Sequence, residues 1–297
     1  MSLELPARAG SLVWSNPVAR WWAFLTLVSG VNITGWLMLY RWFHDARPGG
    51  IASTSGIGLM LFFSAAYVFG CAFRSILPRA DVQRICLFDT WLSSVVVGRL
   101  VATVAEVSFA AQWALMLHHL GTLTGADTTL TAAWLIVPLI VIAQCLSWYA
   151  VLTRNFLWHA VENSTWAVAF FIVGAGLCRL LPEFDGVVRA MLVIAIVGIA
   201  GFLAFLATVD VPMYLARSRA DLAQGSVPLS PLEGLRDVSV RWVVTHDIAE
   251  WKEEIPWMSL YFSVAVWSSL ALCICYAFAD QLPGIHTGAT AVGWLRP

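Results

Sequence analysis

Two side chains that can do acid–base or metal chemistry, His159 and Glu162, lie one helical turn apart in an apolar stretch. Residues three positions apart share a face of a helix, and Trp166 continues that face, with Asn163 next to Glu162 in the chain. A histidine and a carboxylate that face the same space can transfer protons or bind a metal ion. We therefore predict that Glu162 and His159 form an acid/base or ligand pair, with Asn163 and Trp166 in contact with a substrate.

A second group of ionisable residues, Asp89, Arg99 and Glu106, lies in the apolar segment 86–120. An Arg or Asp at the centre of a membrane helix costs roughly 2.5 to 3.5 kcal/mol, so three in one segment imply partners. Arg99, Thr103 and Glu106 share one helical face and form a polar stripe that could line a substrate site or a path. We expect Asp89 to be shallow, Arg99 to lie near the middle of the span and Glu106 beyond it.

Gln144 and Asp210 belong to two other apolar segments, at a depth similar to that of His159 and Glu162. Carboxylates and a histidine at one depth suit a divalent metal ion, which is the candidate cofactor. The candidate metal ligands are Asp89, His159, Glu162 and Asp210. The candidate substrate or path residues include Gln144.

Three interpretations of these polar residues stay open. They could join helices by hydrogen bonds within the membrane, or reach water at the headgroups. They could line a water-accessible site, in which Asp89 serves as a ligand or orienting group and Arg99 stabilises an anionic head group or intermediate. They could also surround a cavity that only holds a lipid or pigment.

The composition places these residues in a membrane protein. Of the 297 residues, 60% are hydrophobic and only 12% are charged, and the mean hydropathy is +0.78. A soluble domain has about 25% charged residues. The net charge of −1 leaves no basic surface for phosphate backbones, so we expect no nucleic-acid partner. The six cysteines fall in or beside apolar runs, which indicates no disulfide framework.

Seven apolar runs are long enough to cross a bilayer, which takes about 20 residues. The sequence therefore predicts an all-α protein, a bundle of seven transmembrane helices in a single domain over 1–297. The expected spans are 20–42, 54–77, 86–118, 131–152, 156–181, 187–214 and 256–279. Retinal proteins hold retinal on a lysine of their last helix. The only lysine here, Lys252, precedes the last span, so the comparison with retinal proteins fails.

The distribution of Lys and Arg predicts the orientation, since cytoplasmic loops carry the excess. With the N-terminus inside, eleven such residues face the cytoplasm and five face outward. The eleven are Arg8, Arg20, Arg74, Arg79, Arg84, Arg154, Arg217, Arg219, Arg236, Arg241 and Lys252, and the five are Arg41, Arg47, Arg179, Arg189 and Arg296. We expect a cytoplasmic N-terminus, an outer C-terminus, and a cytoplasmic loop over 217–255 with an amphipathic segment on the membrane surface. The expected location is a bacterial inner (plasma) membrane.

Three functions fit these features. The first is a membrane-embedded enzyme acting on a lipid or other hydrophobic substrate through Glu162, His159, Asp89 and Arg99. The second is an ion- or proton-coupled transporter or channel, in which Glu106 continues a path across the bundle. The third is an accessory subunit of a membrane complex. The expected partners are membrane lipid and either a second copy of the chain or another membrane protein.

Overall fold

The computed structural model describes residues 16–45 and 56–280, and within them seven helices are long and apolar enough to cross a membrane. The prediction of a seven-helix transmembrane bundle is confirmed. The chain ends, which the orientation prediction concerns, lie outside the described residues, as do Arg8, Arg47 and Arg296. The helices that make up the spans are α2 (Pro17–Asp45), α3 (Gly56–Ile76), α4 (Val95–Thr124), α5 (Asp127–Thr153), α6 (Phe156–Leu180), α7 (Gly186–Phe205) with α8 (Val211–Ala223), and α11 (Glu254–Leu260) with α12 (Val266–Asp280).

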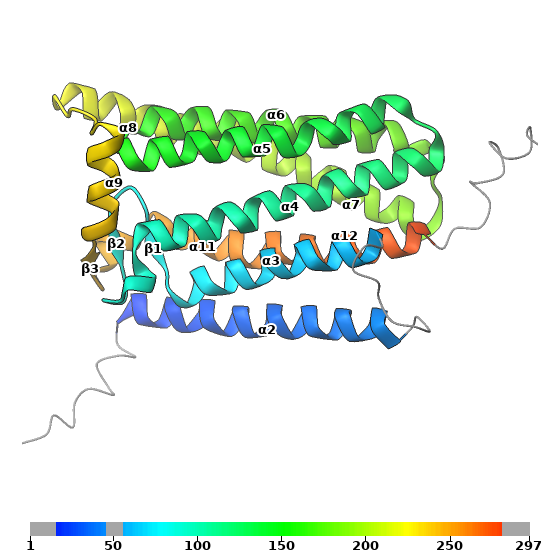
Figure 1. The fold of residues 1–297 in the computed structure, drawn as a ribbon, viewed down its shortest axis with the longest axis horizontal. Helices are drawn as coiled ribbons and strands as arrows, with labels where there is room; N and C mark the ends of the chain where they lie inside the picture. The colour runs from blue at the N-terminus through cyan, green and yellow to red at the C-terminus, as the bar shows by residue number, and fades with distance from the viewer. Residues whose placement is uncertain (1–15, 46–55, 281–297) are drawn as a thin grey trace, which may run out of the picture.

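Successive helices run side by side, so that α2, α3, α4, α5 and α6 form a continuous series of neighbours (Figure 1). Helix α12 packs against α2, α3 and α4, and α7 packs against α6. Tight turns separate the spans: Gly125 ends α4 and Arg154 ends α5, both in the left-handed conformation that closes a helix C-terminus. Asn155 then caps the first turn of α6 through its side chain, which starts the helix that carries His159 and Glu162.

Two of the membrane helices contain a π-helical turn. Leu206–Asp210 joins α7 to α8, and Tyr261–Ala265 joins α11 to α12. Such turns widen the helix locally and occur frequently at functional sites. Asp210 and Tyr261, one from each turn, line the cavity inside the bundle.

The third span begins at Val95, so the predicted start at Cys86 is wrong. Cys86 lies in strand β2 (Ile85–Cys86), and a 3-10 helix (Trp91–Ser93) follows. The reason is local: Ser94 caps α4 by accepting a hydrogen bond from the backbone of Val97 at 3.4 Å, and Ser, Asp and Thr favour caps over helix interiors. Arg99 is therefore in the second turn of α4 and not near its middle.

A small sheet covers one end of the bundle, which we call the sheet end. Strand β1 (Arg79–Ala80) pairs with β2 in antiparallel fashion, and β3 (Val243–Val244) pairs with β2 in parallel. Between α8 and β3, helix α9 (Pro231–Val240) packs on the ends of α4 and α5. After β3, the short helix α10 (Ile248–Trp251) returns the chain to α11, and Trp251 is fully buried.

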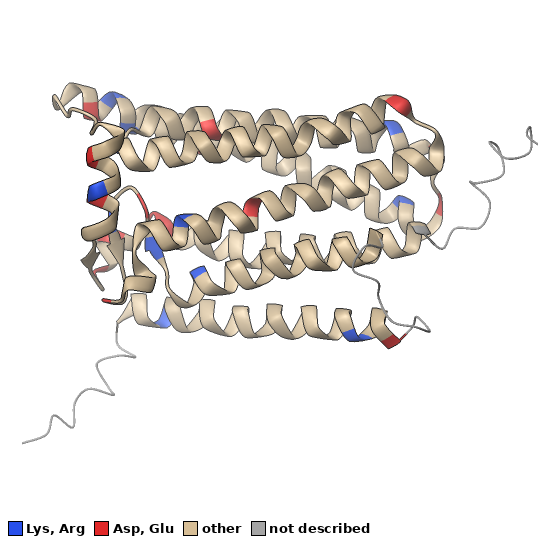
Figure 2. Cartoon of the chain, in the orientation of Figure 1, with Lys and Arg blue, Asp and Glu red and all other residues tan. Residues whose placement is uncertain are grey.

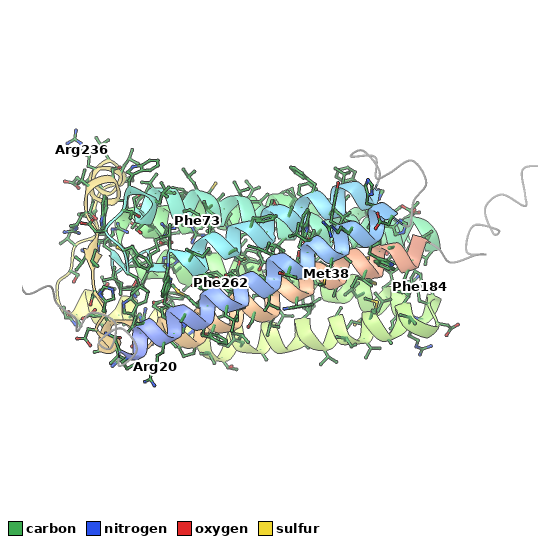
Figure 3. All side chains as sticks on the ribbon, turned by 90° about the horizontal axis from the view of Figure 1, so that it is seen from below. Arg20, Met38, Phe73, Phe184, Arg236 and Phe262 are labelled. Carbon is green, nitrogen blue, oxygen red and sulfur yellow. The ribbon has the colours of Figure 1, made fainter. Side chains whose placement is uncertain are left out.

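The segment predicted to lie on the membrane surface thus packs against the bundle's own end. A Cβ added to Gly234 of α9 would lie 2.1 Å from the carbonyl oxygen of Leu152, which shows how closely α9 approaches α5. Figure 3 shows Arg236 of this segment at the sheet end and Phe184 at the opposite end. Figure 2 shows charged residues gathered at the two ends of the bundle, with few on the spans between.

Candidate functional site

A cavity of about 760 Å³ runs inside the bundle, bounded by α4, α6, α7 with α8, and α11 with α12. Its lining is charged at the sheet end and apolar farther in. Volumes of 300 to 1,000 Å³ are typical of small-molecule sites. The polar residues that line it are Arg74, Arg79, Asp81, Gln83, Arg99, Glu106, His159, Glu162, Asn163, Asp210, Tyr214, Arg217, Glu254, Tyr261 and Ser268.

His159 and Glu162 form the closest acid–base pair in this lining. The Nδ1 atom of His159 lies 2.7 Å from Glu162 Oε2, and both side chains are more than nine-tenths buried. The other ring nitrogen, Nε2, is buried and has no hydrogen-bond partner among the described residues. Tyr214 of α8 stacks on the ring at a centroid distance of 5.1 Å. A carboxylate at Nδ1 favours the tautomer in which Nε2 can accept a proton.

Arg99 connects this pair to the carboxylate deeper in the cavity. Its Nη2 atom lies 3.8 Å from Glu162 Oε1 and 3.6 Å from Glu106 Oε2. Gln144 bridges the same groups, because it accepts a hydrogen bond from Arg99 at 3.0 Å and donates one to Glu106 at 2.6 Å. The amide oxygen and nitrogen of Gln144 are both used, which orients its side chain between the two charges.

Asp81, in the connection between β1 and β2, is shared by three arginines. Arg79 lies 2.9 Å from its carboxylate, Arg99 3.8 Å and Arg74 3.9 Å. Burial alone would raise the pKa of Asp81, but Arg79, then Arg74 and Arg99, outweigh it and hold the pKa below its ordinary value. Burial lowers the pKa of Arg79 to about 10, even with Asp81 beside it. Three arginines thus surround a single aspartate at this corner of the cavity.

On the opposite wall, Asn163 of α6 donates a hydrogen bond to Asp210 in the π-helical turn. The two side chains tie α6 to the junction of α7 and α8. Near the mouth, Gln83 donates to Glu254 at 3.1 Å, and Arg217 pairs with Glu253. The charged end is thus built from six helices, α3, α4, α5, α6, α8 and α11, and from the connection between β1 and β2.

The part of the cavity beyond Glu106 is apolar. Phe109, Trp113 and Met116 follow one another along α4, and Phe170 and Leu177 line the side of α6. Among the described residues that line this part, none is Asp, Glu, Lys, Arg or His. The site therefore has a charged end and an apolar end, like an amphipathic molecule.

Most of the residues predicted for the site line this cavity or its network. Trp166 lines it beside Phe170, with ring centroids 5.7 Å apart. The residues brought together are Arg99, Glu106, Gln144, His159, Glu162, Asn163, Trp166 and Asp210.

Two predicted residues lie elsewhere. Asp89 is exposed and accepts a hydrogen bond from Trp242 at 3.0 Å, so it is separate from the cavity lining. Thr103 accepts a hydrogen bond from Trp148 of α5 at 3.0 Å and serves the packing of two helices. Within the described residues, no group of three or more His, Cys, Asp or Glu side chains is arranged to hold a metal ion, so Asp89, His159, Glu162 and Asp210 do not form the predicted metal site.

Five further residues of the cavity lining are not predicted from the sequence as site residues: Arg74, Arg79, Asp81, Tyr214 and Tyr261. Arg79 and Asp81 lie in a connection between spans, where counting residues along a helix assigns no depth. The available signal was the density of charge in 79–84, two arginines and an aspartate immediately after Pro78. The structure folds this connection inward, and Gly98 allows it, because a Cβ there would lie 0.6 Å from Arg79 Nη2.

Comparison of the chain with models of protein families, with curated proteins and with solved structures finds no match.

Proposed function

We propose that the protein is a membrane-embedded enzyme that acts on an amphipathic, lipid-like substrate, with His159 as the general base. The observation that supports this most is the position of the His159–Glu162 pair, at the charged end of a cavity whose remaining length is apolar. The polar head group of such a substrate would reach the pair, while the apolar chain of the substrate would lie along the apolar side chains of the cavity.

In this proposal Glu162 orients His159 through Nδ1 and stabilises the protonated ring. His159 Nε2 takes the proton of a hydroxyl, either of water or of the substrate, as the hydroxyl oxygen bonds to an ester centre of the substrate. The protonated ring then gives this proton to the oxygen that is released when the ester bond breaks. Arg99 lies 3.8 Å from Glu162 and offers positive charge to a developing anion. Asn163 and Asp210 tie α6, which carries the pair, to the junction of α7 and α8.

The test compares the lipids of cells that produce the wild type with those of cells that produce Glu162→Gln. Untargeted mass spectrometry should find at least one lipid class that changes in amount with the wild type only. Glu183→Gln, an exposed glutamate at the other end of α6, is the matched control and should behave as the wild type. Identical lipid profiles for wild type and Glu162→Gln would contradict the proposal.

One observation favours a second candidate, a proton-coupled transporter. The ionisable groups form a connected series from Asp81 through Arg99 to Glu106, deeper than a catalytic pair at the sheet end requires. Glu106→Gln should then abolish proton uptake by vesicles that contain the protein. In the enzyme, the same variant should leave turnover largely intact, because Glu106 contacts Arg99 and Gln144 and lies away from His159.

A further inference from the structure

The cavity opens sideways, between α7 and the helix formed by α11 and α12. Gly198 and Gly201 of α7 line the cavity, are exposed on the outer surface, and would place a Cβ with no atom within 4 Å. Across the opening, Leu260 and Val264 also line the cavity, although 50% and 61% of their surfaces are exposed. Residues that belong to both the cavity and the apolar outer surface mark a route between cavity and bilayer.

The charged end of the cavity suits an anion. Arg74, Arg79 and Arg99 gather around one carboxylate, Asp81. Arg99 also faces two glutamates on its other side, and Glu254 interacts with Arg74, so the arginines offer clustered hydrogen-bond donors and not a net positive charge. Arginine recognises phosphate and carboxylate groups through planar, paired hydrogen bonds. Arg99 Nε is buried and has no hydrogen-bond partner among the described residues.

The apolar end suits a hydrocarbon chain. From Glu106 to Met116, α4 advances roughly 15 Å, at about 1.5 Å per residue. Over that length the cavity is lined by Phe109, Trp113 and Met116 on one side and by residues of α7 and α12 on others. A hydrocarbon chain that moved from the bilayer to this part of the cavity would exchange one apolar environment for another. The free-energy cost of that transfer would therefore be small.

We propose that the cavity binds one amphiphile with an anionic phosphate or carboxylate head at Arg74, Arg79 and Arg99, and that its apolar chain passes sideways between Gly198–Gly201 and Leu260–Val264. This inference rests on the proposed function, because it names the class of substrate on which the proposed enzyme would act. The binding itself does not require His159 to react.

The experiment measures lipid retained by the full chain. The protein is incorporated into phosphatidylcholine nanodiscs that contain either phosphatidylglycerol or oleic acid, and retained molecules are quantified by native mass spectrometry. The wild type should retain the anionic molecule in preference to phosphatidylcholine. Gly201→Trp, which fills the opening, should lower retention about tenfold, as expected for a binding penalty near 1.4 kcal/mol.

Gly30→Trp is the matched control. Gly30 is also an exposed glycine of a membrane helix where a Cβ would meet no atom within 4 Å, but it lies on α2, away from the opening. This variant should retain lipid as the wild type does. Gly198→Leu repeats the test with a smaller side chain if Gly201→Trp does not fold. Retention by folded Gly201→Trp or Gly198→Leu equal to that of the wild type would overturn the route.

Arg74→Gln should lower retention of the anionic molecule about tenfold without changing that of phosphatidylcholine, since it removes one charged hydrogen-bonding group. Preferential retention of phosphatidylglycerol would identify the head group as a phosphate, and preferential retention of oleic acid would identify it as a carboxylate. Equal retention of phosphatidylcholine and both anionic molecules by the wild type would overturn the head-group assignment.

The two measurements, retention and lipid conversion, separate this inference from the proposed function. Retention that depends on Gly201 and Arg74, together with lipid profiles unaffected by Glu162→Gln, would support the binding site and contradict the enzyme. Lipid conversion by a wild type that retains no anionic molecule would support the enzyme and overturn the binding site.

Discussion

At the scale of single residues, Arg99 is the group on which the charged end depends. It is within 4 Å of three carboxylates, those of Asp81, Glu106 and Glu162, and it donates a hydrogen bond to Gln144. A buried charge of this kind is costly by itself and is offset only by the partners around it. Removing Arg99 would leave Glu106 and Glu162 close together without a cation between them.

We therefore expect Arg99→Ala to lower the free energy of unfolding in detergent by about 3 to 5 kcal/mol, the cost of breaking a buried pair from one side. The control is Arg189→Ala, since Arg189 is half exposed and pairs with exposed Asp185 at 3.6 Å. Surface pairs contribute about 0 to 1 kcal/mol. A loss for Arg99→Ala no larger than for the control would show that Arg99 does not hold the cluster together.

The pH dependence of stability should reveal Asp81. Its pKa in the folded protein lies below the ordinary value, against the effect of burial, because Arg79, Arg74 and Arg99 favour the carboxylate. Its contribution is therefore fully present above its unfolded pKa, about 3.9, and is lost as the pH falls through the folded value. Melting temperatures of wild type and Asp81→Asn should differ at neutral pH and converge in acid. A difference that stays constant into acid would contradict this role.

At the scale of elements, the approach of the β1–β2 connection to α4 depends on the absence of a side chain at Gly98. Replacing an interior helical glycine by alanine ordinarily stabilises by roughly 0.5 to 1 kcal/mol. At Gly98 the new Cβ would occupy the position of the Arg79 guanidinium, which also donates a hydrogen bond to the carbonyl of Ser94. The steric effect should exceed the helix preference.

We expect Gly98→Ala to lower stability by about 1 to 3 kcal/mol, the usual cost of overpacking, as measured by chemical unfolding. Gly198→Ala is the control, because its Cβ would meet no atom within 4 Å. The control should be neutral or slightly stabilising. Stabilisation of both variants by the same amount would mean that Arg79 does not pass over Gly98.

Arg84 links helix α9 to the bundle, beside the packing of Val238 on Val95 and Val151. This buried arginine donates to Asp237 of α9 at 3.0 Å and to the carbonyl of Val151 at the end of α5 at 2.8 Å. Arg241 also pairs with Asp237, at 2.7 Å, but is half exposed. The two arginines therefore offer a matched comparison at one carboxylate.

Arg84→Met should increase hydrogen exchange over 231–244, because α9 would lose its link to α5 and leave Asp237 without its buried partner. Arg241→Met should change exchange in the same segment only slightly, since exposed pairs contribute little. Hydrogen exchange followed by mass spectrometry measures both. Equal effects of the two variants would show that burial of Arg84 is not what holds α9.

At the scale of the whole molecule, the sequence predicts the bundle well because hydropathy over about 20 residues is a strong signal. It also predicts that Glu106, His159, Glu162 and Asp210 face inward, since an unpaired charge facing lipid would be costly. It cannot show where helices converge, which depends on packing between distant segments. The expectation that Asp89 lies within the third span is wrong for a local reason. Ser94 caps α4, so the helix begins at Val95, after Asp89 in the chain.

The molecule as a whole is asymmetric along its length. One end has the sheet, α9 and the charged network, and the cavity continues from there into an apolar half that opens toward the outer surface of α7. Such an arrangement suits a molecule with one polar end that stays within the bilayer. An ion path would need polar groups on both sides of Glu106.

The most direct test of the enzymatic proposal is conversion of lipid by the purified protein. The wild type in vesicles made from the total lipid extract of its expression host should convert one lipid class over time, followed by mass spectrometry. Glu162→Gln should be slower by about 10² or more, the usual contribution of an oriented general base. Conversion at equal rates by wild type and Glu162→Gln, or conversion by neither, would contradict the proposal that the protein is an enzyme acting through His159 and Glu162.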